Sequence, residues 1–363
     1  MRLGVAAAVV DGRLVPGDVE VEGPSVVAVG LGGAGSGVAL PGFIDIHTHG
    51  YAGVDFAHAS PDEMRTASAS LTATGVTGFQ PTLLTLAESD FRDALQSHAA
   101  AHYEGATFLG THLEGPFLSP EYPGAHDPDL LRNPDLDFCR RLVDSGQVGQ
   151  MTLAPELPGA FELIDLLGQT GSAIAVGHSN ADAAVAHRAF DSGARILTHV
   201  FNASRPFSHR DPGVGGVALT RPDVFISAVV DNVHLSREAT LLAMSVGADR
   251  FLVVTDAMSG TGQGDGTYRL GNREVTVHGG EARLADGTIA SSVLTMDAAL
   301  RNLVELGWDL PRASAALATT PGRAIGRSDM GAISVGSRAD IVVVDDELGV
   351  RATFVSGEEK YRR

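Results

Sequence analysis

The chain has 363 residues, 44% of them hydrophobic, and a formal net charge of −18 at pH 7. The composition predicts a folded globular protein, and the acidic balance argues against nucleic acid or an anionic membrane as a general partner. One cysteine, Cys139, excludes an intrachain disulfide, and the position of the only lysine, Lys360, near the C-terminus excludes P-loop, Schiff-base and carbamylated-lysine chemistry.

The first forty residues alternate short apolar runs with turns. Strands are predicted over residues 5–10, 19–21 and 26–29, and the Asp11-Gly12 pair after the first run is typical of a hairpin turn. The first run is short and lacks a clear cleavage site, so we interpret it as a strand rather than a signal peptide. No stretch is long and apolar enough to span a membrane, and we expect a cytoplasmic protein.

From residue 38 onward the pattern changes to a repeat of strand, loop and helix. A Pro-Gly break followed by apolar residues predicts a strand from Phe43 to His47, and Ser60, Pro61 and Glu63 form a helix start with a capping box. Further strands are predicted over 76–81, 106–113, 150–154, 173–176, 196–200, 224–230 and 251–254, with helices over 88–103, 160–167, 181–192 and 237–246. Eight strands alternating with helices predict a (β/α)8 TIM-type barrel.

The end of the chain returns to β structure. A hairpin is predicted over 267–284, helices over 294–306 and 311–318, and strands over 339–344 and 352–355. We expect the two chain ends, residues 1–40 and 329–363, to pair into a small β-sandwich domain beside a catalytic barrel of residues 41–328.

Five of the predicted barrel strands end in histidine or carboxylate side chains. Active sites of such barrels lie at the C-terminal ends of the strands. His47 and His49 follow the first strand, and because side chains alternate along a strand, both point the same way. The other strand ends carry Glu114, His178, His199 and Asp256. Imidazole and carboxylate ligands suit Zn²⁺, Fe²⁺ or Mn²⁺ without selecting among them, so the pattern predicts a metal site.

The motifs at these strand ends resemble those of a known family. Pro41-Gly42-Phe43-Ile44-Asp45-Ile46-His47-Thr48-His49-Gly50 is similar to the opening motif of the amidohydrolase superfamily. The motifs that begin His112-Leu113-Glu114, Gly177-His178-Ser179, Thr198-His199-Val200 and Val254-Thr255-Asp256 narrow the resemblance to its N-acetylglucosamine-6-phosphate deacetylases. The resemblance implies metal-dependent hydrolysis of the acetamide of N-acetyl-D-glucosamine 6-phosphate to D-glucosamine 6-phosphate and acetate, in amino-sugar catabolism and cell-wall sugar recycling.

The same resemblance implies the metal ligands and the catalytic groups. Glu114, His178 and His199 would hold one divalent metal, while His47 and His49, with Glu114 bridging and Asp256 beneath, would hold a second. Glu114 would replace the carbamylated lysine of dihydroorotases and hydantoinases, since residues 150–156 contain no lysine. Retention of both His47 and His49 favours two metals over one. Zn²⁺ is the expected ion, with Fe²⁺, Mn²⁺ and Co²⁺ as alternatives. Asp256 would be the acid and base for a metal-activated hydroxide.

Substrate-binding roles are also implied by the resemblance. His126 would polarise the amide carbonyl, and Asn202 and Ala203 would bind the phosphate. Arg210 and His234 would add positive charge, and the loop of residues 208–213 would be an interface element that favours a homodimer.

Several alternatives stay open at this level. The same chemistry on N-acetylgalactosamine 6-phosphate would leave the metal motifs unchanged, and an inactive metal-binding paralogue is a second alternative. The family commonly has Met after Asn-Ala, whereas this chain has Ser204-Arg205; Arg205 is interpreted as a solvated loop charge or a further phosphate or sugar ligand. The glycine-rich segment 260–266 would flank the sugar or merely connect. His98 and His102 are expected on an exposed helix face.

Overall fold

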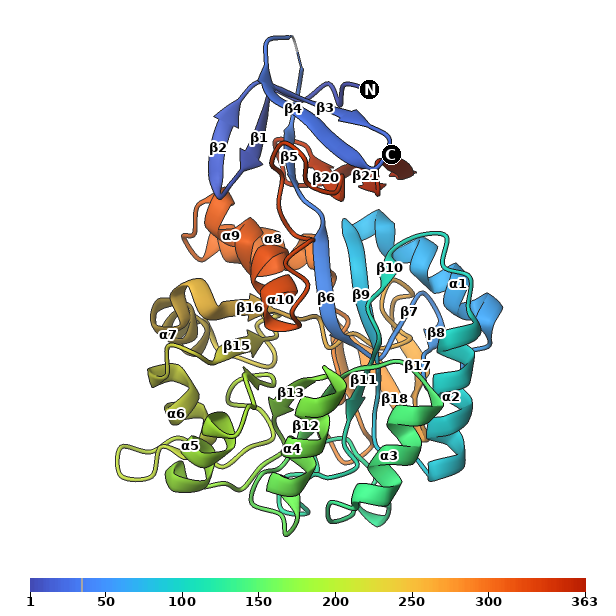
Figure 1. The fold of residues 1–363 in the computed structure, drawn as a ribbon, viewed down its shortest axis with the longest axis vertical. Coiled ribbons are helices and arrows are strands. Elements are labelled where there is room, and N and C mark those ends of the chain that lie inside the picture. Colours follow the sequence, from blue (N-terminus) through green and yellow to red (C-terminus); the bar gives the residue numbers. More distant parts are fainter. Residues whose placement is uncertain (34) are drawn as a thin grey trace.

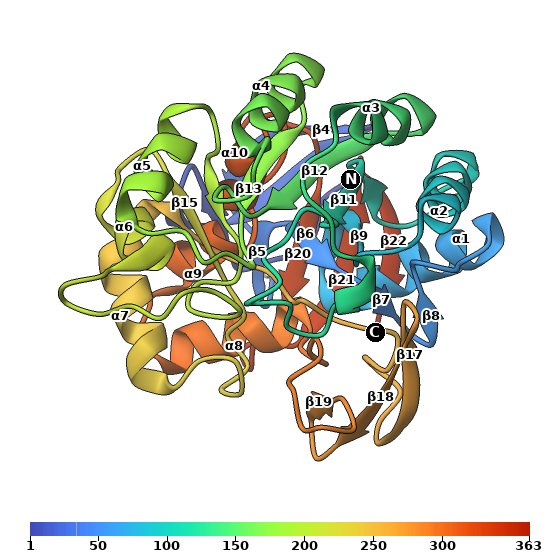
Figure 2. The same ribbon diagram turned by 90° about the horizontal axis from the view of Figure 1, so that it is seen from below.

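The computed structural model describes residues 1–33 and 35–363, and its centre is a parallel barrel (Figures 1 and 2). The eight strands are β6 (Phe43–Thr48), β9 (Val76–Leu83), β11 (Thr111–Glu114), β12 (Val148–Leu153), β13 (Ala173–Val176), β14 (Ile196–Leu197), β15 (Phe225–Ala228) and β16 (Phe251–Val253). Each pairs in parallel with the next. A parallel bridge from Thr48 to Ala257 joins the first strand to the segment after the last. The predicted (β/α)8 barrel is confirmed.

Helices cover the outside of the barrel (Figure 2). They are α1 (Pro61–Leu71), α2 (Glu88–Ala100), α3 (Leu136–Ser145), α4 (Ala160–Thr170), α5 (Ala183–Asp191), α6 (Gly213–Thr220), α7 (Arg237–Gly247), α8 (Met296–Glu305), α9 (Leu310–Leu317) and α10 (Thr319–Ala324). The predicted capping box at α1 is present, because Ser60 Oγ accepts from the Glu63 amide and Glu63 Oε2 accepts from the Ser60 amide. Short 3₁₀ turns lie at Thr72–Thr74, Pro128–Leu130 and Ala248–Arg250.

The two chain ends form the second, smaller β unit, at the top of Figure 1. Its six-stranded sheet has the order β2 (Arg13–Pro16), β1 (Ala7–Val10), β5 (Val38–Pro41), β20 (Ile341–Val344), β21 (Val350–Val355), β22 (Glu358–Arg362). The hairpin of β3 (Asp18–Glu22) and β4 (Ser25–Leu31) contributes Val19, Val21 and Val26 to a core shared with Ile341 and Phe354. The expected pairing of the N- and C-terminal strands is therefore confirmed.

Smaller strands lie outside the eight-stranded barrel. β7 (Gly50–Tyr51) pairs with β8 (Val54–Asp55), β10 (Thr107–Phe108) pairs with β9, and β17 (Gly266–Leu270), β18 (Arg273–His278) and β19 (Glu281–Arg283) form an antiparallel sheet. This sheet matches the predicted hairpin of 267–284. The sequence patterns missed α6, whose Gly-Val-Gly-Gly start has low helix propensity; its residues 213–219 are all buried, so packing sustains the helix. Over the described residues, no helix has the length and apolarity needed to cross a membrane.

Candidate metal centre

Six side chains from the carboxyl ends of five barrel strands meet at one mouth of the barrel. His47 is in β6 and Glu114 is the last residue of β11. The remaining four follow strand ends within three residues: His49 after β6, His178 after β13, His199 after β14 and Asp256 after β16. All six are buried. The fold therefore brings the predicted ligands together at the rim formed by the carboxyl ends of the barrel strands.

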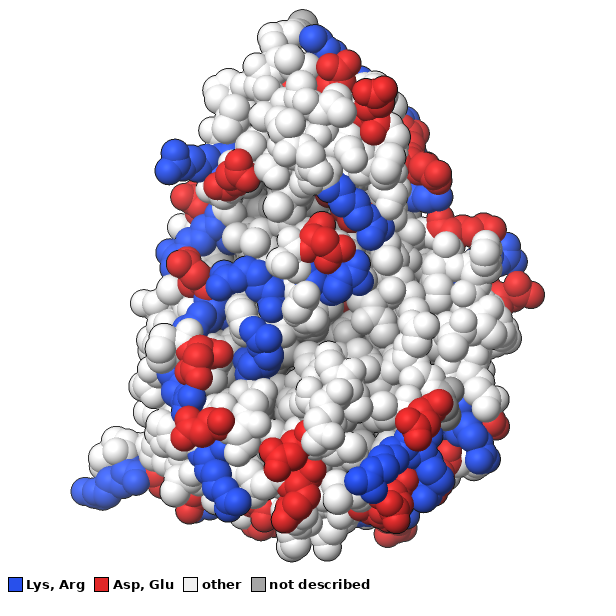
Figure 3. Space-filling view, viewed as in Figure 1, with Lys and Arg blue, Asp and Glu red and all other residues white. Residues whose placement is uncertain are grey.

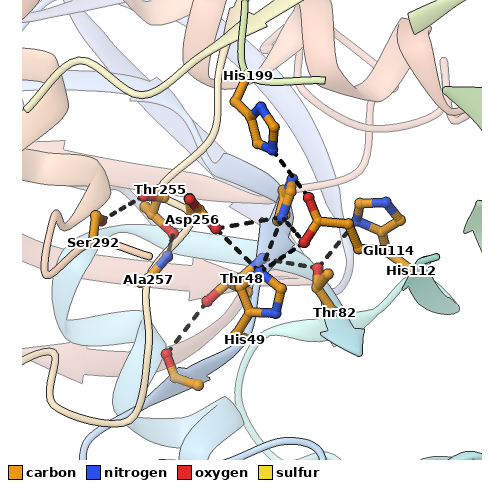
Figure 4. Close-up of polar contacts among 12 residues, drawn as sticks. Thr48, His49, Thr82, His112, Glu114, His199, Thr255, Asp256, Ala257 and Ser292 are labelled. Atoms are coloured by element: carbon orange, nitrogen blue, oxygen red, sulfur yellow. Dashed lines mark hydrogen bonds and ion pairs between the residues drawn. The ribbon is translucent and has the colours of Figure 1, made fainter. Parts of the chain in front are cut away.

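Glu114 lies at the centre of this group (Figure 4). Its Oε1 atom is 3.2 Å from His178 Nε2 and 3.0 Å from His199 Nε2. Its Oε2 atom is 3.3 Å from His49 Nε2 and 3.5 Å from His47 Nε2. Each carboxylate oxygen thus faces its own pair of imidazoles. Two triads follow, Glu114 with His47 and His49 and Glu114 with His178 and His199, and the ligand atoms of each lie within 4.8 Å of one another.

Asp256 completes the side of the group next to β6. Its Oδ1 atom is 3.1 Å from His49 Nε2 and 3.4 Å from His47 Nε2. The Asp256 amide donates to the His47 carbonyl at 2.9 Å, which fixes the end of the last barrel strand against the first. Four imidazole Nε2 atoms and two carboxylates converge in this buried space. Neutral imidazoles and ionised carboxylates are the ligand types that bind divalent cations such as zinc and iron, so the group fits such ions.

Backbone turns aim three of these ligands out of their strands. His178, His199 and Asp256 have φ values of +49°, +26° and +52°, in the left-handed region that non-glycine residues rarely adopt. Such strain is retained at functional sites when surrounding contacts enforce it. Around His178 the backbone packs closely: a Cβ atom at Gly124 would lie 2.9 Å from the His178 ring, and His178 Nδ1 lies 2.9 Å from the Tyr122 carbonyl oxygen.

The electrostatics of the group keep both carboxylates charged. Burial alone would raise the pKa of Glu114, but the His47 imidazole and hydrogen bonds from His126, His178 and His199 hold it well below its usual range. Burial acts in the same direction on Asp256, and there the hydrogen bond from His49 and neighbouring imidazoles lower its pKa. Two ionised carboxylates are therefore available at neutral pH as ligands and proton acceptors.

His112 lies behind the ligands. Its ring stands edge-on to His47 with centroids 4.7 Å apart. Both of its ring nitrogens are engaged, Nδ1 with Thr82 Oγ1 at 3.2 Å and Nε2 with Thr152 Oγ1 at 2.8 Å. Contacts of this kind orient ligand rings from outside the ligand set.

A cavity of about 260 Å³ opens in front of the ligands. His126 faces it with Nε2 at 3.3 Å from Glu114 Oε2. His234 lies opposite, with Nδ1 at 2.8 Å from Asp231 Oδ2 and Nε2 at 3.6 Å from Asp256 Oδ2. The lining residues include the predicted Asn202 and Ala203. Arg210 is not among the lining residues of this chain and is exposed on the segment that follows β14.

The comparisons with known proteins agree with this geometry. Residues 38–360 match the model of the amidohydrolase family. This chain belongs to the amidohydrolase family. It is 35% identical over 325 residues to the N-acetylgalactosamine-6-phosphate deacetylase of Escherichia coli O157:H7, a match that covers 88% of this chain and 86% of that protein. It is 35% identical over 334 residues to the N-acetylglucosamine-6-phosphate deacetylase of Bacillus subtilis, covering 88% and 84%.

A solved structure of a relative matches this amidohydrolase along its whole length. It is a mutant of the N-acetyl-D-glucosamine-6-phosphate deacetylase of Mycobacterium smegmatis, in complex with N-acetyl-D-glucosamine-6-phosphate. The TM-score is 0.93 at 35% sequence identity, and the match covers 99% of both chains.

The amidohydrolase cavity also contains residues that the sequence motifs did not single out as site residues. They are Leu84, Gly124, Ala125, Thr288, Ile289 and Ser291. Segment 260–266, which was a candidate to flank the sugar, is absent from the cavity lining, whereas Thr288, Ile289 and Ser291, which follow β19, are part of it. Arg205 is a partly exposed loop charge outside the cavity lining, and it forms an ion pair with Asp211 at 2.7 Å.

Proposed function

We propose that this amidohydrolase is an N-acetylglucosamine-6-phosphate deacetylase, which hydrolyses the acetamide of N-acetyl-D-glucosamine 6-phosphate to D-glucosamine 6-phosphate and acetate. One observation carries the proposal: Glu114 offers its two carboxylate oxygens to two separate pairs of imidazoles at the mouth of a cavity that also contains His126 and Asp256. The similarity to sugar-phosphate deacetylases over nearly the whole chain supports the substrate class.

The buried histidine and glutamate groups are consistent with a binuclear metal site. We propose that His178 and His199 hold one divalent ion and His47, His49 and Asp256 a second, with Glu114 bridging. Zn²⁺ is the expected ion, and Fe²⁺, Mn²⁺ and Co²⁺ have the same ligand preferences. A metal in such a site supplies Lewis-acid polarisation and lowers the pKa of a water molecule to roughly 7.

The protein's own groups have two tasks around the scissile amide. Asp256 is ionised, so it accepts a proton from the attacking water and then delivers it to the departing amine nitrogen. His126 directs a ring nitrogen into the cavity and donates a hydrogen bond to the acetamide oxygen, where negative charge develops. Proton delivery and charge stabilisation thus come from different elements of the barrel mouth.

The phosphate is assigned to the side of the cavity that follows β14. Asn202 offers a side-chain amide and Ala203 a backbone N–H, and His234 adds an imidazole. Arg210 is exposed on a segment that protrudes from the barrel in Figures 1 and 2. We propose that Arg210 reaches the cavity of a second subunit and that the protein is a homodimer. A guanidinium suits phosphate because its planar fork donates two hydrogen bonds.

Acidic and basic side chains are interspersed on the face shown in Figure 3, which therefore offers no single-sign surface for a polyanion. The phosphate must then be bound by local groups such as those above. A phosphorylated sugar is a substrate of intracellular metabolism, and for this reason we propose a cytoplasmic location.

A second candidate substrate is N-acetylgalactosamine 6-phosphate, favoured by the similarity to the Escherichia coli O157:H7 enzyme. The deciding experiment measures acetate release from both epimers, with and without a chelator. Chelator-sensitive release that is faster from the gluco epimer supports the main proposal, and faster release from the galacto epimer supports the second. No acetate from either epimer in the presence of metal would identify the chain as an inactive metal-binding paralogue or as a hydrolase of another amide.

A further inference from the structure

A short excursion of the chain, residues 206–210, leaves the barrel directly after the cavity-lining Asn202 and Ala203. All five of its residues are exposed, including Phe207 and Arg210. The segment between β14 and α6 that contains it projects from the body of the protein (Figures 1 and 2). An exposed excursion of this kind is conformationally free unless its ends are held.

The Arg205 guanidinium holds the two ends of the excursion together. Its Nε atom donates to Asp211 Oδ2 at 2.7 Å, and its Nη2 atom is 2.7 Å from the same oxygen. A tight turn supports the closure, because the Ser208 amide donates to the Asp211 carbonyl at 2.8 Å and the Asp211 amide donates to Ser208 Oγ at 3.1 Å. The ion pair therefore closes the base of the loop that bears Arg210.

The same guanidinium also contacts the turn that follows the metal ligand His178. Its Nη1 atom donates to the Asn180 carbonyl at 3.1 Å and lies 3.3 Å from Asn180 Oδ1. The Arg205 amide donates to the Ser179 carbonyl at 2.8 Å. On the opposite side of this turn, Glu156 accepts from the Asn180 amide at 2.5 Å and from the Ser179 hydroxyl at 2.7 Å. One side chain thus joins the loop after β14 to the turn after β13.

We propose that Arg205 is a positioning residue that braces the phosphate-facing loop against the turn after His178, and that it does not bind the phosphate itself. Its donors are directed to Asp211 and Asn180 rather than to the cavity, and the Asp211 carboxylate neutralises its charge. The brace holds the loop in place before the phosphate binds. Less conformational entropy is then lost on binding, and the affinity for the phosphate is higher. The inference rests on the proposed function, since it assigns the loop to the phosphate of the sugar.

The test compares Arg205→Ala, Arg205→Lys and Asp211→Ala in the full chain with metal bound. For N-acetylglucosamine 6-phosphate, each variant should raise KM roughly fivefold, the effect of one freed side chain or loop contact, with kcat nearly unchanged. Arg205→Lys should raise KM as much as Arg205→Ala does, because a single ammonium group cannot contact Asp211 and Asn180 at the same time. Arg205→Ala combined with Asp211→Ala should be no worse than either alone. KM for unphosphorylated N-acetylglucosamine should stay the same.

The alternative role predicts opposite results. If Arg205 bound the phosphate directly, Arg205→Lys would keep a positive charge for it and recover much of the KM lost in Arg205→Ala, and Asp211→Ala would lower KM by freeing the guanidinium. Either outcome overturns the brace. Arg221→Ala is the matched control, because Arg221 forms ion pairs with Asp191 and Asp223 away from the cavity and its loss should lower Tm without changing KM.

A second readout does not depend on catalysis. Trypsin cleavage after Arg210, followed by mass spectrometry, should be faster in Arg205→Ala and in Asp211→Ala than in the wild type or in Arg221→Ala. If the wild type releases no acetate, the proposed function fails, yet the cleavage rates still report on the brace. Unchanged cleavage in both loop variants would overturn the brace even in a fully active enzyme.

Discussion

His126 Nδ1 accepts a hydrogen bond from the backbone N–H of Thr85, with the two nitrogens 3.1 Å apart. In a neutral imidazole one ring nitrogen accepts and the other carries the proton, so the proton of His126 resides on Nε2. Burial lowers the pKa of His126 to about 4, which keeps the ring neutral at pH 7. His126 therefore contributes a neutral ring whose Nε2–H faces Glu114 Oε2 at 3.3 Å at the edge of the cavity, rather than a positive charge.

This tautomer predicts how His126 variants behave. Removing the donor with His126→Ala should lower kcat for N-acetylglucosamine 6-phosphate by roughly 10²- to 10³-fold, as removal of other transition-state donors does. His126→Gln should recover part of the loss, because its amide N–H reaches a position similar to that of Nε2. Steady-state kinetics of both variants is the measurement, and an Ala variant with the wild-type kcat would remove His126 from the reaction.

Asp256 is expected to be the proton acceptor and donor of the reaction. Asp256→Asn keeps an oxygen that can face a metal but removes the proton-accepting carboxylate, so kcat should fall by roughly 10²- to 10⁴-fold. Metal content must be measured on the same preparation by elemental analysis, because Asp256 also lies beside His47 and His49. An Asn variant with its metal retained and kcat unchanged would rule out the acid–base role.

The two triads that share Glu114 predict a hierarchy of metal loss. After dialysis against trace metal, the wild type should hold close to two ions per chain. His47→Ala should hold about one fewer, because the Glu114, His178 and His199 triad is intact. Glu114→Ala should lose both ions, since its two oxygens belong to both triads. A wild type that never exceeds one ion per chain would show that the triad of His47, His49 and Glu114 does not hold a second metal.

Arg210 predicts a phosphate-specific effect. Arg210→Ala should raise KM for the phosphorylated sugar far more than it lowers kcat, because binding of the phosphate is remote from the reacting bond. Equal KM values for wild type and variant would exclude Arg210 from phosphate binding.

Mixed dimers test which subunit supplies Arg210. Arg210→Ala and Asp256→Asn subunits, refolded together or co-expressed, should form a dimer in which the Arg210→Ala subunit keeps Asp256 and receives Arg210 from its partner. That site should regain the wild-type KM. If no low-KM activity appears in the mixture, Arg210 does not act across the interface.

The barrel and the gathering of histidines and carboxylates at its mouth were predictable because both follow from local patterns. Buried parallel strands are continuous apolar runs, and a barrel brings their carboxyl ends to one rim, so His47 and Glu114 were placed without knowledge of any contact. Thr288 and Ile289 could not be found this way. They reach the cavity because the antiparallel sheet of β17, β18 and β19 packs beside it against Leu84 and Ala125, which is a tertiary arrangement.

Side-chain pairing was equally beyond local patterns. Arg205 was expected to be a solvated loop charge or a ligand, and it is partly exposed; its pairing with Asp211, six residues later across the base of a loop, was not foreseen. His98 was expected on an exposed helix face and is fully buried instead. Its ring lies between Thr111 Oγ1, at 2.9 Å from Nδ1, and the Phe56 carbonyl, at 2.9 Å from Nε2. A histidine whose partners lie 13 and 42 residues away leaves no periodic signal in its own helix.

The buried His98 predicts an acid-sensitive component of stability. Burial lowers its pKa from 6.5 to about 4. Between these pH values the unfolded chain binds a proton at His98, whereas the ring in the folded protein remains neutral. The free energy of unfolding should therefore fall as the pH drops from 6.5 toward 4, by up to about 1.4 kcal/mol per pH unit for this residue. Above pH 6.5 the contribution is constant, because the ring is neutral in both states.

Urea unfolding of the wild type and His98→Gln at several pH values measures this component. The variant should be less stable at pH 7.5 because it loses packing and a fitted hydrogen bond, yet its stability should decline less steeply between pH 6.5 and 4. His102→Gln, at an exposed histidine just beyond the same helix, is the matched control and should keep the wild-type slope. If the stability of wild type and of His98→Gln changed equally with pH, the folded protein would bind a proton at His98 as readily as the unfolded chain does. That result would contradict the lowered pKa of His98.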